Sequence, residues 1–191
     1  MKKPTLLNFP EKIESERLYI RPCLPGDGKI VHEAIVRSKE QLKMWLPFAK
    51  EERTVDEVED GIRQSYAEFI KRTDFRLHIF LKETDEFIGS TGFHRVDWEI
   101  PKVEIGYWLD TRHTRKGYMR EVVQTLTTFA FDTLQVNRVE IRCDEKNIAS
   151  RRIPEKLGYV LEGTLRNDDV SVSGPELRNT CIYAVIPSDW K

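Results

Sequence analysis

The sequence lacks several features that mark common classes of protein. Its three cysteines, Cys23, Cys143 and Cys181, are far apart and odd in number. This pattern predicts neither a disulfide framework nor a Cys-x-x-Cys metal site, and it suits a reducing compartment. No apolar run approaches the ~20 residues of a membrane span, and the broken apolar stretch at the start lacks the core of a signal peptide. We therefore expect a cytoplasmic protein that has no contact with a membrane.

An excess of basic charge is also missing. Lys and Arg number 31 against 32 Asp and Glu, which gives a formal net charge of −1. No global field would draw the protein onto nucleic acid, so any anion site must be local. The four histidines share no metal-ligand spacing, and we expect no metal. Neither G-x-x-x-x-G-K-[ST] nor G-x-G-x-x-G occurs, which excludes the P-loop NTPases and the usual dinucleotide-binding fold.

What remains is a soluble, mixed pattern of helices and strands. At 191 residues, without repeats or a linker-like segment, we predict a single domain over 1–191. Thr54 and Glu57 have the spacing of a capping box at the start of one helix. The order of elements indicates a sheet with interleaved helices, antiparallel at first and parallel at one central pair. Helices are predicted within 27–50, over 54–72, from 119 to 134 and within 147–158, and strands at 17–22, 75–82, 86–96, 103–109, 138–143, 159–165 and 178–186.

One basic turn carries more information than its surroundings. The segment TRHTRKGYMRE (111–121) places Arg112, Arg115, Lys116 and Arg120 around Gly117, between a strand-like run and a helix. A helix start presents unpaired N–H groups and the positive end of the helix dipole, and glycine allows an anion to approach the backbone. The residues alone fit either an anion site or a solvated turn with exposed arginines.

The ordered motifs around this turn resemble a known family. EIGYWLDTRHTRKGYMREVV, followed after a helix and a strand by NIASRRIPEKLGYVLEG, is similar to the GNAT superfamily of N-acetyltransferases. More narrowly, it resembles the ribosomal-protein (RimJ/RimL-like) branch. The resemblance implies an α/β (α+β) fold, in which about four helices flank a mixed, mostly antiparallel sheet of six to seven strands that is splayed at its centre. It also implies acetyl-CoA as co-substrate.

The resemblance further implies where the coenzyme binds. Its pyrophosphate would lie on the turn, and its pantetheine would run along strand 103–109. Asn147 would bond the pantetheine, cap a helix, or do both. The implied coenzyme-binding residues are Trp108, Leu109, Thr114, Arg115, Lys116, Gly117, Tyr118, Met119, Arg120 and Asn147.

The turn departs from the family pattern at three positions. Thr114 replaces an Arg or Gln, Arg115 replaces a glycine, and Met119 replaces a small residue. We expect backbone N–H donation to survive a side chain wherever φ stays negative. Arg112, Arg115 or Arg120 would offset the missing cation.

Three residues are candidates for catalysis. Ser150 matches the family position whose hydroxyl protonates the coenzyme thiolate, but it also fits a helix N-cap. Pro154 lacks an N–H, so it leaves the Ser150 carbonyl without its partner in the helix. Glu104 fits a general base acting through water or a strand carboxylate paired with an arginine. Asp169 fits an acidic base or a solvated loop carboxylate.

The acceptor is less defined. Trp45 would wall an acceptor groove or anchor the core, and the acidic segment 51–60 would guide a cationic acceptor or simply begin a helix. We predict acetyl transfer to a primary amine, first a protein N-terminus, with a polyamine, aminoglycoside or amino acid as alternatives. A non-catalytic acyl-CoA-binding module is the other class. Nucleic-acid binding is disfavoured, and a homodimer would be in keeping with this branch.

Overall fold

The protein is built on one sheet with helices on both faces. The structure, a computed structural model, describes residues 3–172 and 174–190. The strand order in the sheet is β1-β2-β3-β4-β5-β6-β8-β7. The strands are β1 (Ile13–Glu14), β2 (Leu18–Pro22), β3 (Phe75–Leu81), β4 (Phe87–Asp97), β5 (Lys102–Leu109), β6 (Arg138–Asp144), β7 (Val160–Val170) and β8 (Leu177–Val185).

The predicted fold class is confirmed, with one strand more than expected. The sheet has eight strands where six to seven were predicted. The addition is β1, whose two residues pair with Ile20 and Tyr19 of β2. So short a strand has no periodicity that a sequence pattern could reveal.

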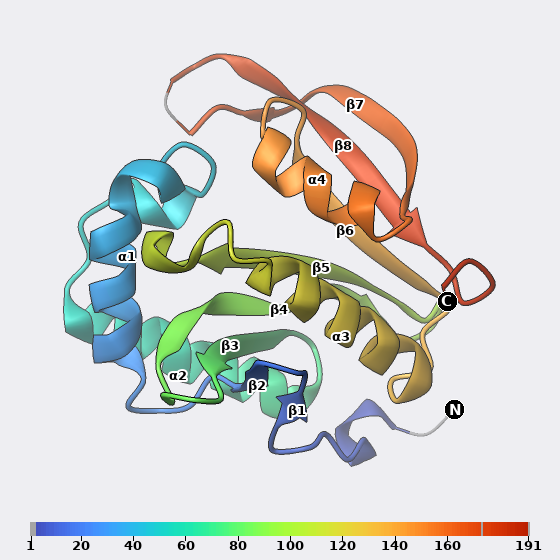
Figure 1. The fold of residues 1–191 in the computed structure, drawn as a ribbon, viewed down its shortest axis with the longest axis horizontal. Coiled ribbons are helices and arrows are strands. Elements are labelled where there is room, and N and C mark those ends of the chain that lie inside the picture. Colours follow the sequence, from blue (N-terminus) through green and yellow to red (C-terminus); the bar gives the residue numbers. More distant parts are fainter. Residues whose placement is uncertain (1–2, 173, 191) are drawn as a thin grey trace.

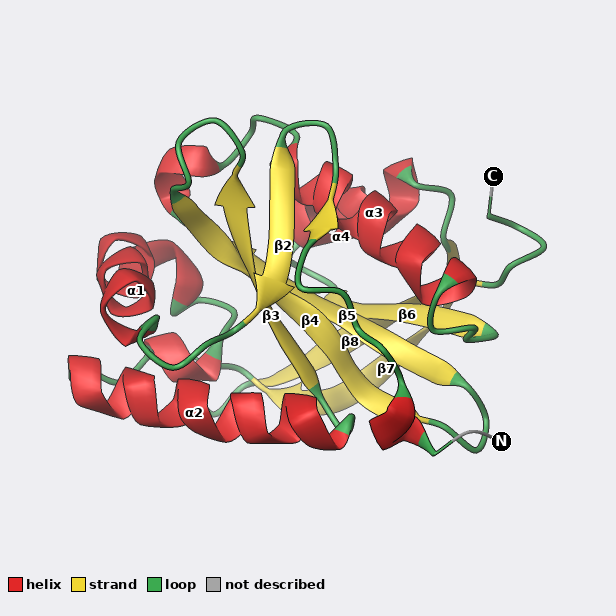
Figure 2. Ribbon diagram, turned by 90° about the horizontal axis from the view of Figure 1, so that it is seen from below, coloured by secondary structure: helices red, strands yellow, loops and turns green. Residues whose placement is uncertain are grey.

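Four α-helices cover the sheet, as predicted. They are α1 (Gly28–Leu42), α2 (Val55–Lys71), α3 (Tyr118–Asp132) and α4 (Ile148–Lys156), with short 3-10 turns η1 (Pro4–Leu6), η2 (Pro47–Ala49) and η3 (Thr111–His113). The capping box of α2 is confirmed, because Thr54 accepts from the Glu57 amide and Glu57 accepts from the Thr54 amide. Helices α1 and α2 lie on one face, and α3 and α4 lie on the other (Figure 2).

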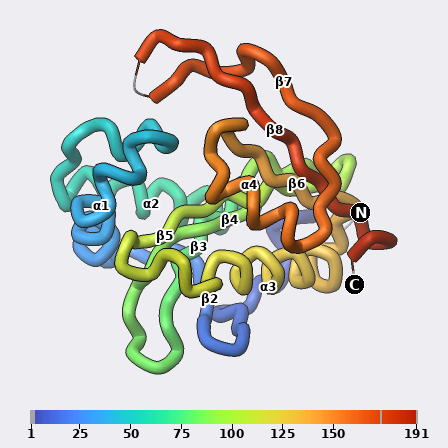
Figure 3. The backbone as a smooth tube through the Cα atoms, turned by 45° about the horizontal axis from the view of Figure 1, so that its top comes forward, coloured from blue at the N-terminus to red at the C-terminus, as the bar shows by residue number. Residues whose placement is uncertain are grey.

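The sheet opens at its centre. β5 and β6 run parallel but pair only from Lys102–Arg138 to Glu104–Glu140. Beyond that point β5 continues beside β4, and β6 continues beside β8 (Figure 1). We call the resulting wedge the β5–β6 gap. The far ends of β7 and β8 reach toward α1 across its mouth (Figure 3). The predicted central parallel pair and splay are both present.

Two apolar clusters hold the layers together. The apolar face of α3 packs on the sheet. Phe129 of this face is partly buried, and the other apolar residues of the face are buried. A second cluster joins α1 and α2 to the opposite face, where Trp108 of β5 and Phe87 of β4 lie. Each fully buried aliphatic or aromatic side chain contributes about 1.5–3 kcal/mol. The buried α3 residues are Met119, Val122, Val123, Leu126, Ala130 and Phe131, and those of α1 and α2 in the second cluster are Val31, Ala34, Leu42, Val58 and Ile62.

Close packing between β4 and β5 gives a stability prediction. A Cβ at Gly89 would lie 2.3 Å from the Trp108 carbonyl oxygen, whereas a Cβ at Gly61 in α2 would meet nothing within 4 Å. We expect Gly89→Ala to lower the free energy of unfolding by about 1–3 kcal/mol, because β5 must move. Gly61→Ala should raise it by about 0.5–1 kcal/mol through helix propensity. Urea titrations of both variants measure this, and equal stabilities would contradict the close approach.

Candidate functional site

The edge of β5 that faces the gap is defined by its pairing with β4. The Asp110 amide donates to the Ile88 carbonyl at 2.8 Å, in register with the β4–β5 ladder. Bonding alternates along an antiparallel ladder, so the backbone groups of Trp108 are directed to β4. Those of Tyr107 and Leu109 are directed into the gap. Of the two strand residues implied as coenzyme contacts, Leu109 therefore offers backbone groups to the gap, and Trp108 offers its side chain to the α1–α2 face.

Tyr107 connects the two sides of the gap. Its hydroxyl lies 3.2 Å from both the carbonyl oxygen and the Oγ of Ser150, in the first turn of α4. The carbonyl is the group that Pro154 leaves without a helical donor, and the phenol supplies the replacement. Burial raises the pKa of Tyr107, so the phenol remains protonated as a donor.

Ser150 is not the cap of its helix. Asn147 is the N-cap of α4, since its Oδ1 accepts from the Ser150 amide at 3.1 Å. The Ser150 hydroxyl is consequently free of a capping role and is held beside the Tyr107 hydroxyl. Cys143 lies nearby on β6, and burial raises the pKa of its thiol to about 12.

The basic turn presents a run of free amides. Within the described residues, the backbone N–H groups of 115–120 donate to no protein acceptor, and the first helical bond runs from Glu121 to Gly117. Gly117 has φ +82°. Arg115 also has a positive φ of 63°, so the condition of a negative φ, on which we expected N–H donation to depend, is not met at this residue. The left-handed conformation explains why a glycine is usual there and costs arginine about 1–2 kcal/mol. Met119 points its larger side chain into the core.

A clamp from the β1–β2 turn fixes this helix start. Glu121, in the first turn of α3, accepts from the Ser15 hydroxyl at 2.7 Å and from the Arg17 amide at 2.8 Å. Arg17 also donates to the Lys116 carbonyl at 3.1 Å and covers the Tyr118 ring. Beside the clamp lies a recess of about 280 Å³ lined by Arg17, Arg120 and Gly117 among others. The sequence analysis missed Arg17, because no local spacing links it to a residue 104 positions away.

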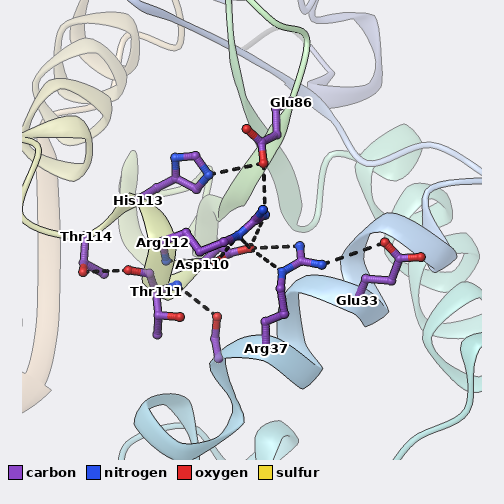
Figure 4. A network of polar contacts seen from close by, with 9 residues as sticks. Glu33, Arg37, Glu86, Asp110, Thr111, Arg112, His113 and Thr114 are labelled. Carbon is purple, nitrogen blue, oxygen red and sulfur yellow. Dashed lines mark hydrogen bonds and ion pairs between the residues drawn. The ribbon is translucent and has the colours of Figure 1, made fainter.

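The other end of the turn is tied to α1. Figure 4 shows Asp110, just after β5, between Arg37 of α1 and Arg112. The Asp110 side chain is fully buried. Burial alone would raise its pKa, but the bonds from Arg112, its amide and Arg37 lower it to about 2. Because Arg112 also pairs with Glu86, it is engaged away from the turn, which leaves Arg115, Lys116 and Arg120 as the cations of the turn available to a phosphate.

A cavity of about 610 Å³ lies on the other face of the sheet, between α1, α2 and strands β3 to β5. Gly106, Tyr107 and Trp108 of β5 line it, so it reaches the strand that borders the gap. From the MWLPF segment, Leu46 and Phe48 line the cavity, whereas Trp45 is partly exposed beside them and is not among the lining residues.

Glu104 faces this side of the sheet among arginines. Its Oε2 lies 3.2 Å from Arg95 and 3.9 Å from Arg142. Burial raises its pKa despite both cations. Glu104 does not line the cavity, although its register partner His94 does. Asp169 lies exposed on β7 and bonds Arg178 at 2.6 Å, which lowers its pKa. The structure thus brings neither carboxylate into the cavity wall.

His94 is a group that the sequence analysis missed. Its Nδ1 lies 2.7 Å from Asp74, and a carboxylate can only accept, so Nδ1 carries the proton and Nε2 presents a lone pair. The ring lies over two glycines: a Cβ at Gly92 or Gly106 would come within 3.0 or 3.2 Å of Nε2. No partner of Nε2 is found in the described chain. Only the tertiary fold brings Asp74 beside His94.

Residues 3–172 and 174–190 contain no group of three or more His, Cys, Asp or Glu arranged to hold a metal ion. Over the same residues, no helix combines the length and apolar character needed to cross a membrane.

The depressed pKa of Asp110 gives a pH prediction. Its folded-state pKa lies below the unfolded value of 3.8, so its stabilisation is complete above about pH 4 and is lost as the pH falls toward 2. We expect Asp110→Asn to lower the free energy of unfolding by about 2 kcal/mol at pH 7, and the deficit to shrink between pH 4 and 2. Asp132→Asn, at the exposed end of α3, should change it by less than about 0.5 kcal/mol. Urea midpoints across pH test this, and a pH-independent deficit would contradict the linkage.

Comparison with known proteins agrees with this geometry. Putative ribosomal N-acetyltransferase YdaF of Bacillus subtilis is 29% identical over 181 residues, covering 93% of this chain and 95% of that protein. The ribosomal-protein-serine acetyltransferase of Escherichia coli is 28% identical over 155 residues, covering 80% and 84%. The structure of RimL, a ribosomal alpha-N-protein acetyltransferase, in complex with coenzyme A superposes with a TM-score of 0.86 at 21% identity, covering 92% and 98%. The model of the acetyltransferase (GNAT) domain matches residues 17–160, and the chain belongs to this family of N-acetyltransferases.

Proposed function

We propose that the protein transfers the acetyl group of acetyl-CoA to the α-amino group of a protein N-terminus. The observation that carries the proposal is the β5–β6 gap, which has a turn of free amides at one end and borders the cavity at β5. Such a gap lets a thioester and an amine meet from opposite faces of the sheet, and a single ternary complex needs no covalent enzyme intermediate.

The coenzyme would be held mainly by backbone groups. The free amides of 115–120 and the start of α3 favour a pyrophosphate, with Arg115 and Arg120 adding charge-assisted bonds. The gap-facing backbone of Tyr107 and Leu109 suits the amides of a pantetheine arm. The coenzyme A held by RimL, a protein of the same fold, supports this assignment.

The choice of an α-amine has a physical and a comparative basis. At pH 7 roughly one α-amine in ten is neutral, against about one lysine amine in two thousand, given pKa values near 8 and 10.4. A weak general base in the site is therefore sufficient to deprotonate an α-amine. YdaF and the Escherichia coli relative both carry names that specify ribosomal proteins. Acetylation of a ribosomal-protein terminus is therefore the first activity to seek.

In this proposal His94 is the general base. Asp74 fixes its tautomer and directs the Nε2 lone pair over Gly106, in the wall of the cavity. An imidazole held in this way can accept the proton of a bound ammonium on Nε2. The neutral nitrogen then attacks the carbonyl carbon, the carbon–sulfur bond breaks, and the second nitrogen proton passes to the departing thiolate, which leaves as the free thiol. Glu104, beside His94 in the sheet, stabilises the resulting imidazolium.

Ser150 acts on the leaving sulfur. Its hydroxyl, which lies 3.2 Å from the Tyr107 hydroxyl, can turn to donate to the developing thiolate. Tyr107 is thus a positioning residue, and it fixes the start of α4 as well as the Ser150 side chain.

The activity is tested by mixing the purified chain with acetyl-CoA and a panel of acceptors. The panel contains N-terminal peptides, polyamines, aminoglycosides and amino acids, with thiol release and mass spectrometry as readouts. We expect peptide α-amines to become heavier by one acetyl group. Coenzyme binding without turnover on any acceptor would contradict the proposal and indicate a non-catalytic acyl-CoA-binding module. Turnover confined to small amines would overturn the N-terminal assignment.

Two variants separate the base from the sulfur-side donor. We expect His94→Gln, which can still bond Asp74, to lower kcat/KM by about 10²–10⁴-fold and to remove the acid limb of the pH–rate profile. Ser150→Ala should lower kcat by about 10²-fold and leave that limb in place. The pH profiles of both variants are the measurement. If the acid limb of the pH–rate profile is unchanged in His94→Gln, the general base is Glu104 and not His94.

A further inference from the structure

One arginine in the cavity wall lacks any partner. Arg76 lies on β3, in register with Gly92, and lines the cavity. It is the one partly buried arginine in the described part of the chain whose side chain has neither a hydrogen bond nor an ion pair. The others contact a carboxylate, a hydroxyl or a carbonyl: Arg21, Arg72, Arg138, Arg142, Arg151 and Arg178.

A second cation lies close to it. Arg53, from the segment before α2, lines the same cavity, and its side chain also has no hydrogen bond or ion pair among the described residues. Burial lowers the pKa of Arg76 and the charge of Arg53 lowers it further, whereas the carboxylates Asp74 and Asp27 act in the opposite direction without bonding the guanidinium. A desolvated charge beside a like charge is unfavourable unless an anion compensates it.

Two of the three acidic residues that line the cavity are engaged within the protein, and the third, Glu51, is exposed. Glu52 pairs with Lys39 at 3.0 Å, and Glu57 completes the capping box of α2. Asp74, the acid nearest His94, bonds that imidazole. Part of the negative charge of the acidic segment 51–60, which suggested a cationic acceptor, is therefore bonded within the protein. Apart from the exposed Glu51, the charged side chains of the described cavity wall that lack a hydrogen bond or ion pair, Arg76 and Arg53, are positive.

We propose that Arg76, with Arg53, binds a carboxylate of the acceptor, so that the protein prefers amines that carry an acidic group nearby. Planar, bidentate pairing with a carboxylate is the characteristic contact of arginine. In a protein terminus the carboxylate would be an Asp or Glu side chain close to the first residue. In a small acceptor it would be the α-carboxylate. The inference rests on the proposed function and names the class of acceptor for the same cavity.

The experiment compares acceptors that differ only in charge. Peptides with the same first residue and an amidated C-terminus carry Asp-Glu, Asn-Gln or Lys-Lys at the second and third positions. Free amino acids and their amides form a second arm, which distinguishes an α-carboxylate from an acidic side chain. We expect kcat/KM for the Asp-Glu peptide to exceed that for the Asn-Gln peptide by at least 10-fold. In the second arm, the corresponding result is the same excess of a free amino acid over its amide, and either result supports the inference.

Variants assign the preference to Arg76. Arg76→Met should reduce the acidic-to-neutral ratio to within about 3-fold, and Arg76→Lys should keep part of it. Arg63→Met, on the outer side of α2 and paired with Glu59, should keep the full ratio. If a variant fails to fold, the ratio of kcat/KM for acidic and neutral acceptors, measured on the wild-type protein, decides whether the inference holds. Turnover with equal rates, or a preference for Lys-Lys or polyamines, overturns this inference and leaves acetyl transfer intact. No turnover on any amine overturns the proposed function itself.

Discussion

The pairing between β5 and β6 ends after Glu104 and Glu140, and the site depends on that ending. A continued ladder would satisfy the backbone of Tyr107 and Leu109 and would close the passage between the two faces. Instead, each strand keeps its other neighbour, so the edges stay rigid while they diverge. Tyr107 spans the opening and donates to the carbonyl that Pro154 leaves free in α4. The gap is thus held open by packing and by one phenol.

The turn that follows β5 is joined to the rest of the molecule at both ends. Glu121 ties the start of α3 to the β1–β2 turn, and Asp110 ties the end of β5 to Arg37 of α1. Since α1 also forms part of the cavity wall, one buried carboxylate links the basic turn to the helix that borders the cavity. Movement of α1 would therefore be transmitted to the turn through a bond rather than through a flexible loop.

Charge is distributed in a way that suits the two ligands that we propose. Most arginines that are partly buried have partners within the protein, and Arg112 is withdrawn from the turn by Asp110 and Glu86. The described cations without partners include Arg115 and Arg120 at the free amides and Arg76 and Arg53 in the cavity. A near-zero net charge thus coexists with two local positive sites.

The sequence by itself determined the elements that depend on local spacing. The capping box at Thr54, the apolar face of α3, the central parallel pair and the orphaned Ser150 carbonyl all follow from residues a few positions apart or from the order of motifs. Tertiary structure decided the rest. The Asp74–His94 pair, the Arg17–Glu121 clamp and the unpartnered Arg76 depend on which distant side chains share a volume. The backbone angle of Arg115 belongs with them, because clamps on both sides of the turn set it and no residue type encodes it.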